Sequence, residues 1–244
     1  MLRLILGRAG TGKTGMIMEE IRRRVAAEQG GNILIVPEQY SYEAERELLR
    51  LAGDTASLYA EVLSFTRLAH AVAREVGGSA RVYTDKGGRA LQMALALQRC
   101  APELRLYGSA RQRSETIRPL LSAMDELRCG CIGGDELREA AGACTGQLRQ
   151  KLLDLALLQE AMAALEQQTG ADPGTRLDTL ADDIPRSALL RGGQIYIDGF
   201  TDFTAQERRV IRQLWLCGDV TVCLTCAGLN EEREEFASAA RTAL

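Results

Sequence analysis

The chain has 244 residues, of which 46% are hydrophobic and 26% are charged, and its formal net charge is −3. This length suits one large domain or two small ones with a buried core. The sequence contains no run of about 18 apolar residues, the length needed to span a bilayer. A net negative charge excludes a general attraction to nucleic acid, so any DNA contact must come from local patches. The residues ahead of the first motif, 1–6, are too few for a signal peptide. We therefore expect a cytoplasmic protein without membrane contact.

A phosphate-binding loop is predicted directly behind the first apolar run, residues 2–6. The segment Gly7-Arg8-Ala9-Gly10-Thr11-Gly12-Lys13-Thr14 matches the pattern G-x-x-x-x-G-K-[ST] and precedes a helical stretch. Its glycines let backbone N–H groups approach phosphate oxygens, and the positive end of a helix dipole favours an anion. Lys13 would reach the β and γ phosphates, and Thr14 would offer its hydroxyl to Mg²⁺. We expect ATP and Mg²⁺ as ligands, and the alternative is a glycine-rich turn that binds nothing.

Alternating apolar strands and helices are predicted after this loop. A helix over 16–27 ends at a Gly-rich segment, and the wholly apolar strand 33–36 is typical of a buried parallel sheet. We expect Ser41 to cap the next helix. Strand 60–63 and a helix through residue 75 follow.

From residue 84 to 190 the pattern changes to helices punctuated by Gly and Pro. Helices are predicted over 87–100, 111–128, 135–141 and 146–168, and a loop over 172–185. Strand 194–198, helix 204–216 and strand 220–226 complete the chain. This order predicts an α/β fold in which a parallel sheet is flanked by helices. Residues 1–83 and 191–244 would form the sheet domain, 84–190 an inserted helical subdomain, and the nucleotide would sit at the carboxyl ends of the strands.

Asp198 is the candidate catalytic and second metal-binding residue. In phosphate-loop ATPases, a strand that ends in Asp holds Mg²⁺ and positions the attacking water, and residues 195–198 (IYID) have this form. The alternative is a loop-capping aspartate. Because Gly199 follows, the usual general base is missing, and Asp202, Glu207 and Glu38 are possible substitutes. We therefore expect little hydrolysis.

Arginines and cysteines offer weaker signals. Three arginine clusters are candidate DNA patches, although each is more typical of a solvated helix face: Arg22 to Arg24, Arg111 with Arg113 and Arg118, and Arg208 and Arg209 with Arg212.

The pairs Cys129 with Cys131 and Cys223 with Cys226 could supply four thiolates to zinc or an iron–sulfur cluster. Residues three apart on a strand face opposite ways, so we expect buried core thiols instead. The single histidine, His70, excludes sites that need two imidazoles.

Four segments together resemble the B subunits of bacterial AddAB helicase-nucleases, which are related to superfamily 1 helicases of the UvrD/Rep type. They are residues 7–14, 34–39 (LIVPEQ), 61–69 (EVLSFTRLA) and 196–204 (YIDGFTDFT), and they occur here in the family's order. The likeness covers nearly the whole chain. It implies a RecA-like domain, ATP and Mg²⁺ as ligands, and both DNA and the helicase-nuclease A subunit as partners in double-strand-break repair.

The resemblance also implies residues that lie beside DNA. In the helicase relatives, the segments that match 34–39 and 61–69 run along the single strand. Candidates to touch phosphates or stack on a base are Pro37, Gln39, Ser64, Phe65 and Arg67. For Phe65 the alternative is a packed aromatic at a strand end.

The chain departs from the active helicases at several points. No glutamine-bearing segment precedes the first strand, Gly199 stands in place of the catalytic glutamate, and residues 223–227 (CLTCA) stand where active motors carry a γ-phosphate-sensing glutamine. A second RecA-like domain with an arginine finger, and the family's nuclease domain with its iron–sulfur cluster, do not fit in this length. The resemblance therefore implies an amino-terminal fragment without an iron–sulfur cluster, whose partner A subunit is the main motor.

Two other functions remain open. The first is a self-sufficient small ATPase or kinase in which Asp198 or Asp202 is the base and the helical block is a substrate lid. The second is a degenerate scaffold that binds no nucleotide and only docks a partner protein.

Overall fold

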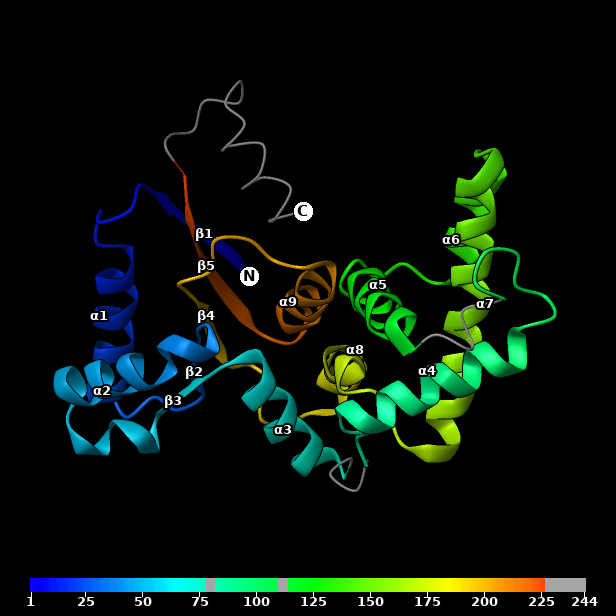
Figure 1. The fold of residues 1–244 in the computed structure, drawn as a ribbon. Coiled ribbons are helices and arrows are strands. Elements are labelled where there is room, and N and C mark those ends of the chain that lie inside the picture. Colours follow the sequence, from blue (N-terminus) through cyan, green and yellow to red (C-terminus); the bar gives the residue numbers. More distant parts are fainter. Residues whose placement is uncertain (78–81, 109–113, 227–244) are drawn as a thin grey trace. The chain divides into compact units, whose positions relative to one another are not determined.

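The computed structural model describes residues 1–77, 82–108 and 114–226 (Figure 1). The chain divides into two compact units. The sheet unit consists of residues 1–79 and 177–244, and the helical unit consists of residues 80–176. The candidate residues Arg111 and Arg113, and Ala227 of the CLTCA segment, lie outside the described residues.

A five-stranded, wholly parallel sheet forms the centre of the sheet unit. Its strands are β1 (Leu2–Gly7), β2 (Asn32–Ile35), β3 (Ala60–Leu63), β4 (Gln194–Ile197) and β5 (Asp219–Thr225). They lie in the order β1-β5-β4-β2-β3, which the labels in Figure 1 follow from top to bottom. The predicted α/β fold with a parallel sheet is confirmed.

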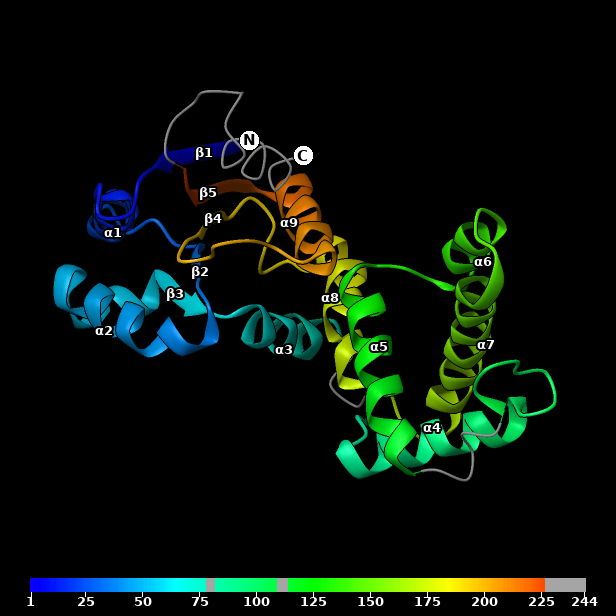
Figure 2. The ribbon, with the colours of Figure 1, turned by 45° about the horizontal axis from the view of Figure 1, so that its top comes forward.

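Helices cover both faces of this sheet (Figure 2). The register places Ile33, Ile195 and Val220 side by side on one face, where they share a core with α3 (Phe65–Val76), α8 (Arg176–Asp183) and α9 (Ala205–Cys217). Leu34 and Tyr196 point to the other face, which α1 (Lys13–Ala26) and α2 (Ser41–Ala52) cover. Both faces are thus buried, which explains why the strands are nearly continuous apolar runs. A short 3₁₀ turn, Asp54–Leu58, connects α2 to β3.

Two local expectations were wrong. Ser41 is the first residue of α2 instead of its cap, because the 3₁₀ turn Glu38–Tyr40 runs directly into the helix and the Ser41 hydroxyl donates to Glu38 O (2.8 Å). The segment 172–185 is helical instead of a loop. Asp172 caps the turn Pro173–Thr175 by accepting from Gly174 N (2.7 Å), and proline suits the first turn of a helix. The α8 helix then buries Leu180 and Ala181 in the core, and the turn Ile184–Arg186 follows.

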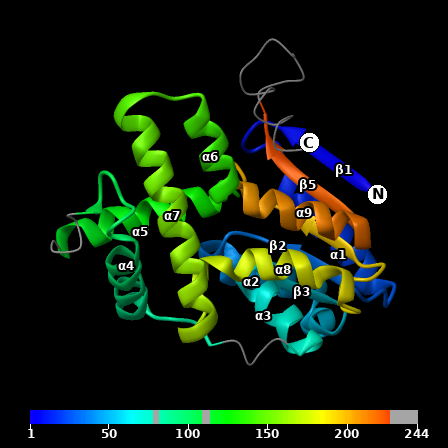
Figure 3. The same ribbon diagram turned by 90° about the vertical axis from the view of Figure 1, so that its right-hand side faces the viewer.

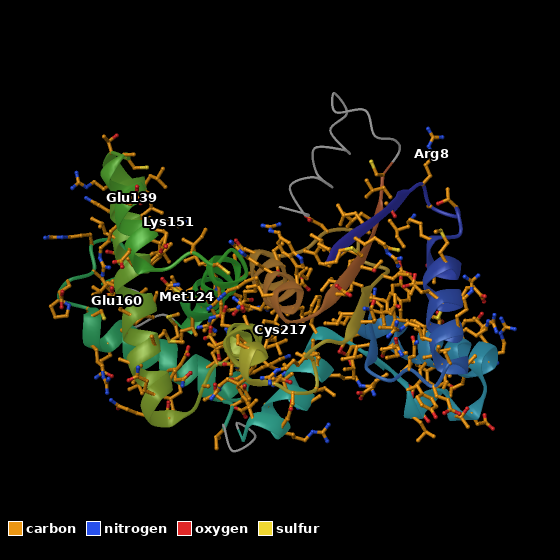
Figure 4. The ribbon with its side chains drawn as sticks, turned by 180° about the vertical axis from the view of Figure 1, so that it is seen from behind. Arg8, Met124, Glu139, Lys151, Glu160 and Cys217 are labelled. Atoms are coloured by element: carbon orange, nitrogen blue, oxygen red, sulfur yellow. The ribbon has the colours of Figure 1, made fainter. Side chains whose placement is uncertain are left out.

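The helical unit contains α4 (Lys86–Cys100), a 3₁₀ turn (Ser114–Thr116), α5 (Ile117–Cys129), α6 (Gly134–Gly142) and α7 (Gly146–Thr169). Figure 3 shows α6 and α7 side by side as a helical hairpin. An ion pair between Arg138 of α6 and Glu160 of α7 joins the two helices. Glu160 is labelled in Figure 4. Met93, Leu120 and Leu158 lie at the centre of a core that α4, α5 and α7 share. Within the described residues, no helix has the length and apolar character to cross a membrane.

Candidate nucleotide-binding site

The candidate site lies at the carboxyl ends of the strands, where β2 and β4 are neighbours. The chain leaves β2 toward β3 and leaves β4 toward β5, so the two connections run in opposite directions. Such a switch point opens a crevice at the carboxyl edge of a parallel sheet, and ligands of α/β proteins bind there. Strand order therefore brings the ends of β2 and β4 together at the place where a ligand is expected.

The backbone of residues 7–14 explains the glycines of the predicted loop. Gly10 and Gly12 have left-handed φ values of 77° and 84°, which residues with a side chain rarely adopt. At Gly7, a Cβ atom would lie 2.7 Å from Thr11 Oγ1. Helix α1 begins at Lys13, so its first backbone N–H groups face the loop. Figure 4 shows Arg8 in this loop with its side chain directed away from the sheet.

The side chain of Lys13 is held at the loop by hydrogen bonds to the backbone of the loop. Its Nζ donates to Gly7 O and to Arg8 O, both at 2.8 Å. The ammonium group has three donors, and these two hydrogen bonds keep the positive charge over the glycine-rich segment. This is where a lysine must lie to meet a phosphate that the loop holds.

Asp198 follows β4 directly and is buried. Its N–H donates to Ile35 O (3.0 Å), which fixes the backbone at the end of the strand. Its carboxylate lies near the thiol of Cys223 on β5. Burial above all, together with the Asp198 carboxylate, raises the pKa of the Cys223 thiol to about 12, and the Lys13 ammonium is near enough to oppose this shift. The charges of Lys13 and Asp198 therefore both act on the thiol of Cys223.

A cavity of about 450 Å³ opens beside these residues, within the size range of ligand pockets. Thr14 and Asp198, the two predicted Mg²⁺ ligands, both line it. The remaining lining residues come from α1, β2 and the residue after it, the turn Glu38–Tyr40, α2 and the residue after Asp198: Met18, Leu34, Val36, Tyr40, Glu43, Ala44, Glu47 and Gly199.

The residues present fit a magnesium nucleotide. No heavy atom lies within 4 Å of the position that a Cβ would take at Gly10 or Gly12, so the loop is open at these two residues. Backbone N–H groups and Lys13 suit the phosphates, and the hydroxyl of Thr14 and the carboxylate of Asp198 are oxygen ligands of the kind that Mg²⁺ prefers.

The position after Asp198 cannot hold a carboxylate without strain. Gly199 has a φ of 83°, and a Cβ there would lie 3.2 Å from Pro37 Cδ.

The three possible substitute bases have hydrogen bonds of their own. Glu38 accepts from the Ser64 hydroxyl, Asp202 from Phe203 N (2.7 Å) and Glu207 from Thr204 N (2.8 Å) in a capping box.

The candidate DNA-contacting residues divide into an exposed and a buried group. Gln39 and Arg67 are exposed and Pro37 is half-buried. Ser64 is buried and caps α3 by accepting from Arg67 N (3.2 Å). Phe65 is only 6% exposed. Its ring packs 5.4 Å from that of Phe200, as the packed-aromatic alternative describes.

Sequence reasoning did not single out the two exposed tyrosines that follow Gln39. Tyr40 lies in the turn after β2, and Tyr42, in the first turn of α2, is 73% exposed. Their signal in the sequence was two aromatic residues directly behind the PEQ segment.

A partly buried polar cluster that sequence reasoning also missed fixes α1 on the sheet. Tyr196 Oη donates to Glu20 Oε1 (3.0 Å), and Arg3 donates to Glu20 Oε2 (2.6 Å) and to Thr221 Oγ1 (3.1 Å). Burial is the main reason why the pKa of Tyr196 lies above its ordinary value. Because α1 carries Lys13 and Thr14 at its start, this cluster helps to position both.

The described arginine clusters are partly paired within the protein. Arg22 and Arg23 pair with Glu19 at 2.7 and 3.0 Å. Arg209 pairs with Asp178 and Asp182 at 3.3 and 2.7 Å. Pairs of this kind are typical of solvated helix faces.

Comparison with known proteins identifies the family. Residues 4–243 match the family described as "ADDB, N-terminal". The chain is 36% identical to the B subunit of the ATP-dependent helicase/deoxyribonuclease of Geobacillus thermodenitrificans, over 99% of this chain and 22% of that protein. Its counterpart in Desulforamulus reducens is 36% identical over 96% of this chain and 21% of that protein, and the one in Pelotomaculum thermopropionicum is 37% identical with the same coverage. The chain thus spans about a fifth of the length of these relatives. It belongs to the family formed by the amino-terminal region of the helicase/deoxyribonuclease B subunits.

Proposed function

We propose that this chain binds ATP with Mg²⁺ at residues 7–14 and contacts DNA, as the RecA-like amino-terminal region of a bacterial helicase-nuclease subunit. The observation that carries the proposal is that Thr14 and Asp198 line one cavity at the switch point of the sheet, beside the loop on which Lys13 is held. These residues come from opposite ends of the sequence and meet only in the fold.

Each residue has a separate task in this proposal. The backbone of the loop and Lys13 hold the phosphates, while Thr14 and Asp198 hold Mg²⁺, which neutralises phosphate charge when bound. Because the strained position of Gly199 carries no carboxylate, the residue that usually activates water is missing there. Nucleotide binding with little hydrolysis is the expected behaviour of this chain alone.

The relatives' name supports the wider role. They are named as subunits of an ATP-dependent helicase/deoxyribonuclease, and a protein of that kind needs DNA and a second subunit. We propose that the A subunit of such an enzyme is the partner and that the complex acts in double-strand-break processing and recombinational repair in the cytoplasm. In this chain, Gln39 and Arg67 are the exposed candidates for the single strand, with Pro37 beside Gln39.

Calorimetric titration with Mg²⁺ and a non-hydrolysable ATP analogue tests the nucleotide site. Lys13→Ala removes a charge-assisted contact worth about 1.5–3 kcal/mol, so affinity should fall roughly ten- to a hundredfold. Lys151→Ala, an exposed lysine of α7 (Figure 4), is the matched control and should bind normally. Equal affinity of the two variants would reject the role of Lys13, and no binding by the unaltered chain would favour the scaffold alternative.

Single-strand binding at several salt concentrations tests the DNA contact. Arg67→Ala should weaken binding of an oligonucleotide and lower the salt slope by about 0.7, the loss of one phosphate contact. Arg149→Ala removes the same charge from an exposed position on α7 and should leave the slope unchanged. If both variants lose affinity equally, the effect belongs to net charge and not to a site at Arg67.

A further inference from the structure

The helical unit carries an exposed pair of thiols that the proposed nucleotide and DNA sites do not use. Cys129 is the last residue of α5, and Cys131 follows Gly130. Cys223 and Cys226 are buried, as expected for core thiols, and so is Cys100. Cys129 and Cys131 are exposed, so the expectation was wrong for this pair. Cysteine is among the residue types most often buried, and core packing does not explain two exposed thiols in one turn.

A Schellman turn holds the pair at the end of α5. The N–H of Ile132 donates to Leu127 O (2.8 Å) and the N–H of Cys131 to Arg128 O (2.9 Å), which is the pattern of this motif. Its left-handed residue is usually glycine. Here it is Cys131, with a φ of 53°, although a glycine stands one position earlier. A left-handed conformation costs a residue with a side chain about 1–2 kcal/mol, and the strained, exposed residue is a thiol, which points to a function.

The turn brings the two cysteines to a distance that a disulfide can bridge. Gly130 between them has helix-like dihedral angles of −80° and −4°. In a helix, residues two apart have Cα atoms about 5.4 Å apart, within the range of roughly 4.4–6.8 Å found in disulfides. The left-handed φ of Cys131 also turns its Cα–Cβ bond away from the direction that a continued helix would give it. Gly130 places no side chain between the two sulfur atoms.

The surroundings favour thiol chemistry over metal binding. Zinc and iron–sulfur sites take four protein ligands or nearly so. In the part of the chain that the structure describes, no cluster of three or more His, Cys, Asp or Glu side chains could hold a metal ion. Two neighbouring thiols are enough, by contrast, for exchange with a disulfide.

We infer that Cys129 and Cys131 form a redox-active dithiol, which a small disulfide such as oxidised glutathione converts into an intramolecular disulfide. One thiolate attacks a sulfur of the small disulfide, forms a mixed disulfide and releases one small thiol. The second thiolate then attacks the protein sulfur of the mixed disulfide and releases the other small thiol. The protein loses two hydrogens as two protons and two electrons, and one small disulfide becomes two small thiols.

The disulfide would form beside the ion pairs that hold the end of α5 in place. Arg128, directly before Cys129, pairs with Glu166 (3.0 Å) and with Asp172 (2.9 Å). These contacts fix the end of α5 against α7 and the turn that follows α7. A disulfide at 129–131 would brace the same helix end.

Mass spectrometry of the purified chain tests the inference. Incubation with oxidised glutathione is followed by alkylation and trypsin, which cuts after Arg128 and Arg138 and releases a peptide that contains Cys129 and Cys131 and no other cysteine. This peptide should be lighter by two hydrogens and should carry no alkyl group. Dithiothreitol should restore two alkylated thiols.

Single substitutions sharpen the test. In Cys129→Ser and in Cys131→Ser, the remaining thiol should keep one glutathione because no second thiol can displace it. Cys144→Ser, a half-buried cysteine of the same unit, should leave the disulfide unchanged. A peptide of the unaltered chain that stays fully alkylated, carries glutathione, or is cross-linked to another peptide would overturn the inference.

Discussion

The thiol of Cys223 lies near enough to the carboxylate of Asp198, at the neighbouring ends of β5 and β4, for the carboxylate to raise its pKa. Asp198 is the carboxylate that we propose as a Mg²⁺ ligand. A protonated thiol beside that carboxylate is a hydrogen-bond donor for the same oxygen that a metal ion would need. The thiol and the proposed Mg²⁺ would therefore compete for Asp198.

Cys223→Ala should strengthen the binding of Mg²⁺ with nucleotide. A thiol is a weak donor, so its removal should free about 1 kcal/mol or less, which lowers the Mg²⁺ concentration at half-maximal nucleotide binding up to roughly fivefold. Nucleotide titrations at a series of Mg²⁺ concentrations measure this. Cys100→Ala, which also removes a buried thiol but lies in the helical unit, is the control. An unchanged Mg²⁺ dependence in Cys223→Ala would mean that the thiol does not compete.

The raised pKa of Cys223 also predicts a loss of stability in alkali. In the unfolded chain a thiol loses its proton near pH 8.5, whereas folded Cys223 keeps it up to about pH 12. Between these values the unfolded state binds fewer protons, so the free energy of unfolding falls as pH rises, by up to about 1.4 kcal/mol per pH unit. The contribution is fully present below pH 8.5. Urea denaturation at pH 8 and at pH 10 should show a smaller loss for Cys223→Ala than for the unaltered chain, and equal losses would contradict the assignment.

Gly199 should resist conversion into a general base. Gly199→Glu places a side chain at a left-handed φ and against Pro37, so it should lower the free energy of unfolding by about 1–2 kcal/mol or more and confer no ATP hydrolysis. Gly142→Ala, at an open position of α6 without a positive φ, should instead stabilise the protein by roughly 0.5–1 kcal/mol. Phosphate release and urea denaturation measure the two effects. A Gly199→Glu variant that is stable and hydrolyses ATP would show that only the missing carboxylate limits turnover.

The sequence predicted the parallel sheet because each buried strand is a short apolar run between Gly, Pro or polar segments. It did not predict the order of the strands, since any order of parallel strands satisfies the same alternation. That order places β5 between β1 and β4 and so brings Cys223 to Asp198. Helix α8 was missed because the prolines at 173 and 185 made its segment resemble a loop. The bond from Tyr196 to Glu20 joins residues 176 positions apart, and no local pattern reveals such a contact.

Substitutions of Phe65 test whether this candidate DNA-contacting residue acts only by packing in the core. Its ring lies in the core beside Phe200, so Phe65→Ala should destabilise the sheet unit by about 3–5 kcal/mol. Any loss of DNA binding would then follow from the damaged fold. Phe65→Leu keeps most of the buried volume and should retain both stability and single-strand affinity. If Phe65→Leu is stable under urea denaturation and yet loses the oligonucleotide, the aromatic ring itself contacts DNA.

Asp172 should be the most sensitive single position of the helical unit. Its side chain is 1% exposed and accepts from Arg89 Nε (2.7 Å) and from Gly174 N (2.7 Å), while Arg128 pairs with it at 2.9 Å. Asp172→Asn leaves two arginines without this buried charge, and removing one partner from a buried ion cluster costs about 3–5 kcal/mol.

Urea denaturation followed by far-ultraviolet circular dichroism measures this loss. Asp135→Asn is the matched control, because the Asp135 side chain is 98% exposed and its pair with Arg138 lies on the surface of α6. The control should change the free energy of unfolding by roughly 0.5 kcal/mol or less. Trp215, the single tryptophan, lies in the sheet unit, and its fluorescence reports on that unit alongside the helical signal. Equal small effects of the two substitutions would show that Asp172 does not hold α4, α5 and the turn after α7 together.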